Sequence, residues 1–287
     1  MPVVSANGAR LHVQRLEPES RPAGGARRPA VVFVHGLVID NLSSFYYTLA
    51  GPVAAAGAPA VLYDLRGHGK SEATPHGYSA ADGAADLIAL LDALGLTEPV
   101  CLVGNSFGGL IAARAAIAAP ARVAGLALIE ACCAGTAADA WLESILNTLT
   151  VSALTLEHYR TADRFLTAGQ RKIGRMALGA DTLLNETSLI DDLAAERPLG
   201  PAELAGIDCA VLAVYGERSD LADGAGELRR CLPRVRVELI DGLAHTVLRD
   251  ATGALTSILL DWLRDQSPVQ ARAQALGRAA DQVAGAR

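Results

Sequence analysis

A serine between two glycines stands where an apolar stretch gives way to an alanine-rich one. The pentapeptide GNSFG, residues 104–108, follows a strand predicted at residues 99–103 and opens a helix predicted at residues 107–119. The glycines let the strand and the helix approach closely, which leaves the Ser106 hydroxyl on a strained turn above the sheet edge. The helix directs free N–H groups and the positive end of its dipole at negative charge that develops there. The pattern therefore predicts that Ser106 is a nucleophile.

A serine hydroxyl is a weak nucleophile unless a base takes its proton, and the sequence holds six histidines. His245 is the candidate, because it follows a strand predicted at residues 235–240 and precedes a helix predicted near residues 251–264. A loop at that position lies at the carboxyl edge of a parallel sheet, on the same side as Ser106. We therefore expect His245 to be the base.

The base in turn needs a carboxylate that fixes its tautomer and stabilises its cation. Asp220 and Glu217 follow a strand predicted at residues 210–215, and Glu130 ends a strand predicted at residues 126–129. Asp220 is the preferred acid. Glu217 and Glu130 stay open as alternatives.

The elements that must position these residues alternate between strand and helix. Apolar runs bounded by turn residues predict further strands, and runs with helical period predict helices. The alternation breaks at residues 135–205, which contain helical patches and no convincing strand. This order predicts an α/β fold: a doubly wound, mostly parallel sheet with a helical cap inserted between strands. Residues 1–134 and 206–266 would form the core, residues 135–205 the cap, and residues 267–287 a tail or an extra helix.

The composition limits the classes of function. The chain has 287 residues, of which 51% are hydrophobic and 20% are charged, as in folded globular proteins. The net charge is −6 and only 4% of the residues are aromatic. A chain without a basic excess does not neutralise phosphates, and one with few aromatic rings offers little surface for stacking bases. We therefore expect no nucleic-acid partner.

We also expect neither a membrane segment nor a metal site. No apolar stretch approaches the roughly 20 residues that span a bilayer, and the N-terminus lacks the pattern of a signal peptide. The five cysteines follow no zinc-binding spacing. They are interpreted as buried thiols of a cytoplasmic protein that needs no cofactor.

Four stretches of the sequence resemble the α/β-hydrolase superfamily. They are VHGL at residues 34–37, DLRGHGKS at residues 64–71, GNSFG at residues 104–108 and GLAH at residues 242–245. The resemblance extends from about residue 30 to residue 263 and implies the α/β-hydrolase fold. The family's triad runs in the order nucleophile, acid, histidine, and Ser106, Asp220 and His245 follow that order.

The resemblance also implies an oxyanion hole, which the backbone N–H groups of Leu37 and Phe107 would form. In the family the acid usually lies three residues after a glycine at the strand end. After Gly216 that position is Ser219, whereas Asp220 lies one residue further. The stretch that begins at Gly36 also differs from the HGGG of some lipases and esterases, which disfavours those branches.

Four residues are candidates for contact with a substrate. Val38 and Leu243 neighbour the predicted catalytic loops, and Trp141 and Leu142 begin the predicted cap. The alternative for Trp141 and Leu142 is that they pack cap helices together. The many Leu and Ala residues of the insertion indicate a mostly apolar pocket.

Together these features favour a serine hydrolase that cleaves a carboxylic ester, thioester or lactone of a small, mostly apolar molecule through an acyl-enzyme on Ser106. The resemblance admits two alternatives that use the same triad, namely hydrolysis of a carbon–carbon bond and acyl transfer. A ligand-binding or receptor-like protein on the same fold is an alternative of another class. The expected partner is a small-molecule substrate, and the sequence sets no oligomeric state.

Overall fold

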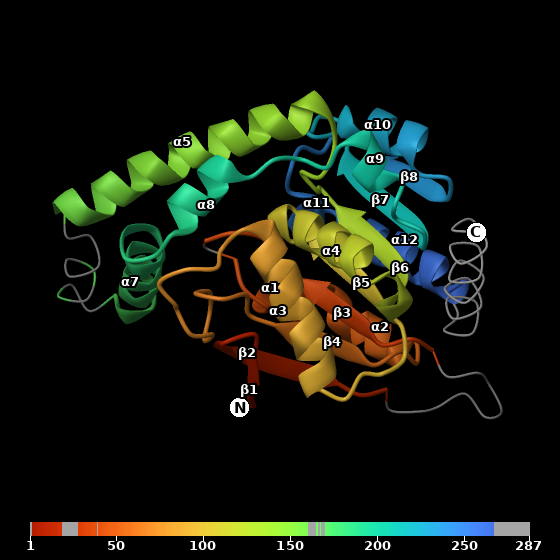
Figure 1. Ribbon diagram of the computed structural model, residues 1–287, viewed down its shortest axis with the longest axis horizontal. Helices are drawn as coiled ribbons and strands as arrows, with labels where there is room; N and C mark the ends of the chain where they lie inside the picture. Colours follow the sequence, from red (N-terminus) through yellow and green to blue (C-terminus); the bar gives the residue numbers. More distant parts are fainter. Residues whose placement is uncertain are drawn as a thin grey trace, which may run out of the picture.

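The computed structural model describes residues 2–18, 28–38, 40–159, 165, 167 and 170–266 (Figure 1). In these residues eight strands form one sheet, in the order β1-β2-β4-β3-β5-β6-β7-β8. Strands β1 and β2 form an antiparallel hairpin, and β2 also pairs antiparallel with β4. The other neighbouring strands pair in parallel. The predicted α/β fold with a mostly parallel sheet is therefore confirmed. The strands are β1 (Val3–Ala6), β2 (Ala9–Leu16), β3 (Val31–Val34), β4 (Ala60–Tyr63), β5 (Val100–Asn105), β6 (Val123–Ile129), β7 (Ala210–Gly216) and β8 (Val235–Ile240).

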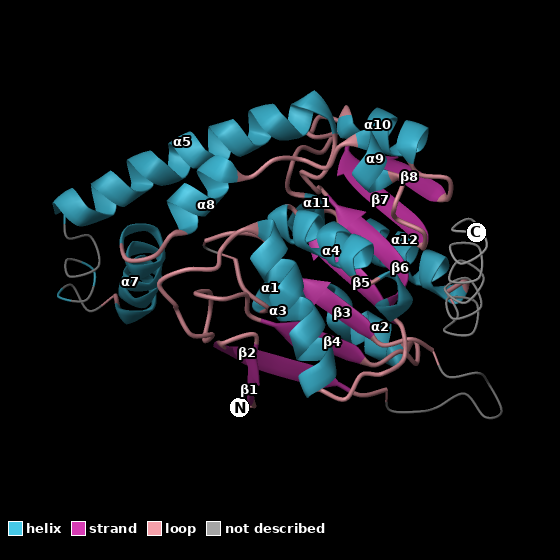
Figure 2. Ribbon diagram, viewed as in Figure 1, coloured by secondary structure: helices cyan, strands magenta, loops and turns pink. Residues whose placement is uncertain are grey.

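Helices cover both faces of the sheet (Figure 2). Those of the core are α1 (Ser43–Phe45), a π-helical turn (Tyr46–Ala50), α2 (Gly51–Ala55), α3 (Ala80–Ala93), α4 (Phe107–Ala118), a 3-10 turn (Pro120–Arg122), α10 (Gly224–Cys231), α11 (Val247–Asp250) and α12 (Thr252–Arg264). Successive residues of a strand point to opposite faces. Val32 of β3 therefore packs in one core with α3 and α4, and Phe33 packs in the other with α1, α2 and α12. Because both faces are covered, the central strands are apolar at nearly every position.

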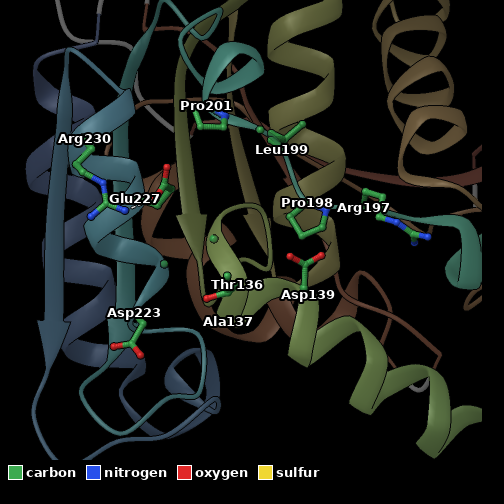
Figure 3. A pocket seen from close by; sticks show the side chains of 13 residues that line it. Thr136, Ala137, Asp139, Arg197, Pro198, Leu199, Pro201, Asp223, Glu227 and Arg230 are labelled. Atoms are coloured by element: carbon green, nitrogen blue, oxygen red, sulfur yellow. Dashed lines mark hydrogen bonds and ion pairs between the residues drawn. The ribbon is translucent and has the colours of Figure 1, made fainter.

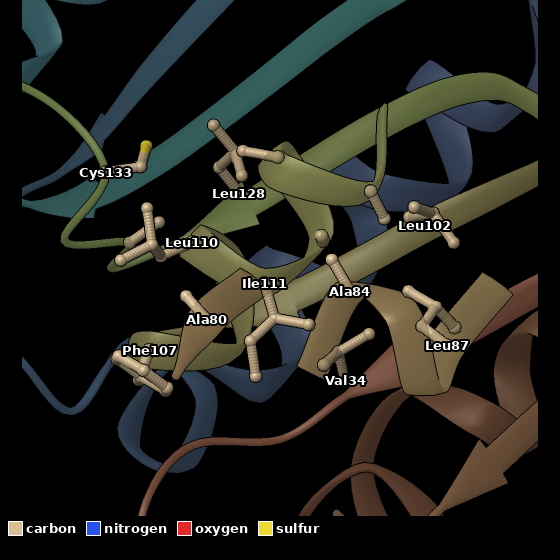
Figure 4. Close-up of a cluster of buried hydrophobic side chains, with 14 of the residues drawn as sticks. Val34, Ala80, Ala84, Leu87, Leu102, Phe107, Leu110, Ile111, Leu128 and Cys133 are labelled. Atoms are coloured by element: carbon tan, nitrogen blue, oxygen red, sulfur yellow. The ribbon is translucent and has the colours of Figure 1, made fainter. Parts of the chain in front are cut away.

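Short side chains bring α3 and α4 close to each other and to the sheet. Figure 4 shows Ala84 of α3 and Ile111 of α4 in one buried cluster with Leu102 of β5. A Cβ on Gly83 would lie 2.8 Å from Cδ1 of Ile111, so any larger residue at that crossing would make the Ile111 side chain shift. This packing fixes the start of α4, the helix that follows Ser106.

A helical insertion, residues 135–205, stands between β6 and β7. It contains α5 (Gly135–Tyr159), α7 (Arg171–Asn185), α8 (Leu189–Ala195) and α9 (Pro201–Leu204). Figure 1 shows the long helix α5 along the top of the molecule, with α8 beside it. Among the described helices, none combines the length and the apolar character that crossing a membrane requires. The expectation of a tail or an extra helix at residues 267–287 lies outside the described residues.

Two carboxylates of the helical insertion, Glu196 and Asp192, hydrogen-bond to the core. Glu196, just after α8, accepts the backbone N–H of Ala80 at 2.7 Å and the Arg114 guanidinium at 2.7 Å. Asp192 of α8 accepts the backbone N–H of Tyr78 at 2.9 Å. The insertion is thereby tied to the start of α3 and to α4, on the side of the sheet where Ser106 stands.

The loops at the carboxyl edge of the sheet are held by two buried histidines. His68 accepts the backbone N–H of Val38 on Nε2 at 2.8 Å and donates its Nδ1 proton to the Arg66 carbonyl at 2.8 Å. His35 accepts the Leu65 N–H on Nε2 at 2.9 Å. An imidazole that accepts on one nitrogen must be neutral. Burial, the main cause, lowers the pKa of His68 to about 4 and also lowers the pKa of His35.

Gly108, in the first turn of α4, permits the closest approach between that helix and β3. A Cβ at this position would overlap the carbonyl oxygens of Val34 and His35, which are rigid backbone atoms. We expect Gly108→Ala to lower the free energy of unfolding by about 3 kcal/mol or more, because neither backbone segment has room to move. Urea unfolding followed by circular dichroism measures this change.

The matched control is Gly179→Ala, in the middle of α7, where nothing lies within 4 Å of an added Cβ. Alanine is the better helix former, so this variant should gain up to about 1 kcal/mol. Equal effects of the two substitutions would show that the turn around Ser106 does not depend on the close approach at Gly108.

The buried histidines predict a stability that falls with acid. Below an ordinary pKa of 6.5 an unfolded histidine binds a proton, whereas folded His68 stays neutral down to about pH 4. The unfolded state therefore binds more protons in this window, and stability is lost as the pH falls from about 6.5 to 4.

His68→Gln keeps a side-chain acceptor for the Val38 N–H. Between pH 7 and pH 4 we expect the free energy of unfolding of this variant to fall by about 3 kcal/mol less than that of the parent chain. Urea unfolding at each pH measures the loss. His76→Gln, at an exposed position, is the control. Parallel curves for the parent chain and His68→Gln would contradict a neutral, buried His68.

Candidate active site

Ser106 stands on the sharp turn between β5 and α4 and is almost fully buried. Its φ of 55° and ψ of −123° are unusual for a residue with a side chain. The turn is held by the neighbouring strand, because the Ser106 N–H donates to the Ile129 carbonyl at 2.9 Å. The hydroxyl lies 3.2 Å from Nε2 of His245. The structure thus brings together the two residues that the sequence singled out as nucleophile and base.

His245 lies in the loop between β8 and α11, with its side chain 36% exposed. Its Nδ1 lies 3.0 Å from Oε2 of Glu130. A carboxylate only accepts hydrogen bonds, so Nδ1 carries the proton and Nε2 presents its lone pair to the Ser106 hydroxyl. This is the tautomer in which an imidazole can take a proton from a serine.

Glu130 follows the last residue of β6 and is fully buried. Besides the His245 proton, its carboxylate accepts the Gly216 N–H on Oε1 at 2.5 Å and the Ser219 hydroxyl on Oε2 at 2.5 Å. Three donors from two other segments of the chain therefore meet one carboxylate. A buried charge is tolerated where it is hydrogen-bonded in this way.

The preference for Asp220 as the acid is corrected by this geometry. Asp220 is exposed, and no hydrogen bond or ion pair joins it to His245, both of which lie in the described part of the chain. Glu217, the second alternative, is also exposed and accepts the Gly242 N–H at 3.0 Å. Glu130 reaches the imidazole because β6 lies next to β5 in the sheet, and the side chain that turns inward after β7 is that of Ser219.

Two backbone N–H groups beside Ser106 are free. The amides of Leu37 and Phe107 make no hydrogen bond to any residue that the structure describes. The amides on either side of Leu37 are occupied, because Gly36 donates to Asp40 and Val38 donates to His68, each at 2.8 Å. The loop therefore leaves one donor unused, as an oxyanion hole requires.

The four candidate substrate contacts lie in different surroundings. Trp141 of α5 is half-buried, with its ring centroid 5.4 Å from that of His245. Leu142 is buried in the core on the α4 side, and Val38 packs partly against that core. Leu243 packs against the core on the opposite face. The structure thus places Trp141 beside the imidazole, and contact of these residues with a substrate stays a prediction.

Two cavities lie near these elements. A small one of about 20 Å³ adjoins the free amides and is lined by Leu37 and Phe107, with His68, Tyr78 and others. A larger one of about 470 Å³ lies beside the start of α5, away from the triad (Figure 3). Its charged lining residues are Asp139, Arg197, Asp223, Glu227 and Arg230.

The contact of Ser219 with Glu130 was not foreseen from the sequence. A signal was present, since Ser219 lies three residues after Gly216, where the family usually carries its acid. A serine at that place, together with a glutamate at the end of the neighbouring strand, indicates that the two side chains meet.

Comparisons with known proteins agree with this architecture. A family model described as the alpha/beta hydrolase fold matches residues 29–149. The putative carbamate hydrolase RutD of Variovorax paradoxus is 39% identical over 110 residues, which are 38% of this chain and 40% of that protein. The pimeloyl-(acyl-carrier protein) methyl ester esterase of Edwardsiella ictaluri is 28% identical over 230 residues, which are 77% of this chain and 83% of the esterase.

Several of these likenesses cover only part of the relative. The alignments with the carbamate hydrolase and two further curated relatives span 28 to 40% of those proteins' lengths. The solved structure of the enol-lactonase from Burkholderia xenovorans covers more, 92% of this chain and 100% of the lactonase, with a TM-score of 0.67 at 22% identity. The eight-stranded sheet, the family match over residues 29–149 and this shared fold show that the chain has the α/β-hydrolase fold.

Proposed function

We propose that the protein is a serine hydrolase that cleaves a carboxylic ester, thioester or lactone of a small, mostly apolar molecule. One observation carries the proposal. Hydrogen bonds run without a break from the Ser106 hydroxyl through His245 to Glu130, beside the unused N–H groups of Leu37 and Phe107. A nucleophile, a base, an orienting acid and two donors for an oxyanion are the parts that acyl transfer to a serine needs.

The first half of the reaction forms an acyl-enzyme. Nε2 of His245 takes the hydroxyl proton while Oγ of Ser106 attacks the carbonyl carbon. The carbonyl oxygen becomes an oxyanion and accepts hydrogen bonds from Leu37 and Phe107, each worth roughly 3 kcal/mol of the barrier. The imidazolium then gives its proton to the leaving oxygen or sulfur, and the bond between that atom and the carbonyl carbon breaks.

The second half regenerates the serine. Nε2 of His245 takes a proton from water, the hydroxide attacks the acyl carbon, and the Oγ–acyl bond breaks with return of the proton to Ser106. Glu130 keeps the proton of His245 on Nδ1 throughout and stabilises the imidazolium by its negative charge. Because Glu130 is buried, little water screens this attraction.

The helical insertion has a part in the proposal. Residues 135–205 would act as a cap over a core of residues 1–134 and 206–266, and Trp141 beside His245 is the point where they meet the triad. Val38, Trp141, Leu142 and Leu243 would line the acyl or alcohol pocket. Two similar proteins, a methyl ester esterase and an enol-lactonase, are named for ester and lactone substrates.

Replacement of the nucleophile tests the reaction class. Ser106→Ala should reduce turnover by at least about 10³-fold without a change in the far-ultraviolet circular dichroism, because the covalent step is lost. The assay is a panel of p-nitrophenyl esters, acyl-thioesters, lactones and vinylogous diketones, which also separates ester cleavage from carbon–carbon cleavage. A fluorophosphonate probe should label the parent chain and not the variant. A folded parent chain that is never labelled would favour a ligand-binding protein.

Matched carboxamide substitutions test the acid. Glu130→Gln should reduce kcat by about 10³- to 10⁴-fold, because an amide in place of the carboxylate neither favours the required tautomer nor stabilises the imidazolium. Asp220→Asn and Glu217→Gln are the controls and should stay within about threefold of the parent chain. A large loss in Asp220→Asn and a small one in Glu130→Gln would contradict the assignment.

A further inference from the structure

We propose that Ser219 is a positioning residue for Glu130, and that its hydroxyl holds the carboxylate oxygen that accepts the His245 proton. The inference rests on the proposed function for its kinetic test. It differs from that function in naming a residue that touches neither the substrate nor the reacting atoms.

The hydroxyl of Ser219 donates its proton to Glu130. Ser219 is buried, with 8% of its surface exposed. Its Oγ accepts the Leu221 N–H at 3.2 Å, so its own proton is free to point elsewhere, and Oε2 of Glu130 lies 2.5 Å away. The turn that holds Ser219 is closed by its N–H, which donates to the Gly216 carbonyl at 3.1 Å. The donor is thus held in place by hydrogen bonds within its own loop.

The carboxylate of Glu130 takes its position from β7 although it belongs to β6. Gly216 fixes Oε1 and Ser219 fixes Oε2, and both donors lie at the carboxyl end of β7 or just after it. The oxygen that Ser219 holds is the one that accepts the His245 proton, at 3.0 Å. Loss of the Ser219 hydroxyl therefore acts on the imidazole through the acid.

Two substitutions remove and restore the hydroxyl at position 219. Ser219→Ala should lower kcat about tenfold and leave KM within about twofold, because a hydrogen bond to a charged group is lost away from the substrate. Ser219→Thr, which keeps the hydroxyl, should return kcat to within about threefold of the parent chain. Ser257→Ala, an exposed serine of α12, is the control and should change neither constant.

A proton resonance separates this inference from the proposed function. The Nδ1 proton of His245 gives a downfield signal in water that reports its bond to Glu130 whether or not an ester is turned over. We expect the signal to shift or broaden in Ser219→Ala and to return in Ser219→Thr. An unchanged signal and an unchanged kcat in Ser219→Ala would overturn the positioning role. Failure of the parent chain to cleave any ester would overturn the proposed function alone.

Discussion

A carboxylate with no exposed surface joins three separate segments of the candidate active site. Glu130 accepts hydrogen bonds from Gly216, Ser219 and His245, so the ends of β6 and β7 and the loop after β8 must keep fixed distances from each other. Each of these bonds satisfies a charge that would otherwise be costly to bury. The orientation of His245 toward Ser106 follows from that constraint, since the imidazole is held on one side by the acid and offers its other nitrogen to the hydroxyl.

Backbone strain is concentrated around this constraint. Val38, Ser106 and Glu130 are three of the four non-glycine residues with positive φ in the described ranges. Such conformations cost about 1–3 kcal/mol each and persist only where the surroundings enforce them. The surroundings here are hydrogen bonds to neighbouring segments. Ser106 donates to Ile129, Glu130 donates to Val214, and the buried His68 accepts from Val38. The parallel sheet and the two loop histidines thus maintain the strained geometry.

The fold and the meeting of Ser106 with His245 were accessible from the sequence, whereas the carboxylate that contacts His245 was not. Ser106 and His245 are marked by glycines and by their position after apolar strands, which are local signals that the sheet preserves. The acid depends on which of several side chains at neighbouring strand ends turns inward, and a shift of one residue reverses that direction. Ser219 turns inward and Asp220 outward. The expected acid is therefore exposed, and Glu130 contacts His245 instead. The helical patches that the sequence predicts within residues 135–205 begin as one long continuous helix, α5 (Gly135–Tyr159).

The central claim is that Ser106, His245 and Glu130 act together beside two free amides. A crystal structure of the protein with phenylboronic acid tests it most directly, because boron forms a tetrahedral adduct with an activated serine. We expect boron bonded covalently to Oγ of Ser106 and one boronate oxygen about 3 Å from the amides of Leu37 and Phe107. His245 should keep its hydrogen bond to Glu130. A structure without a bond to Ser106, or with the boronate oxygen turned away from both amides, would contradict it.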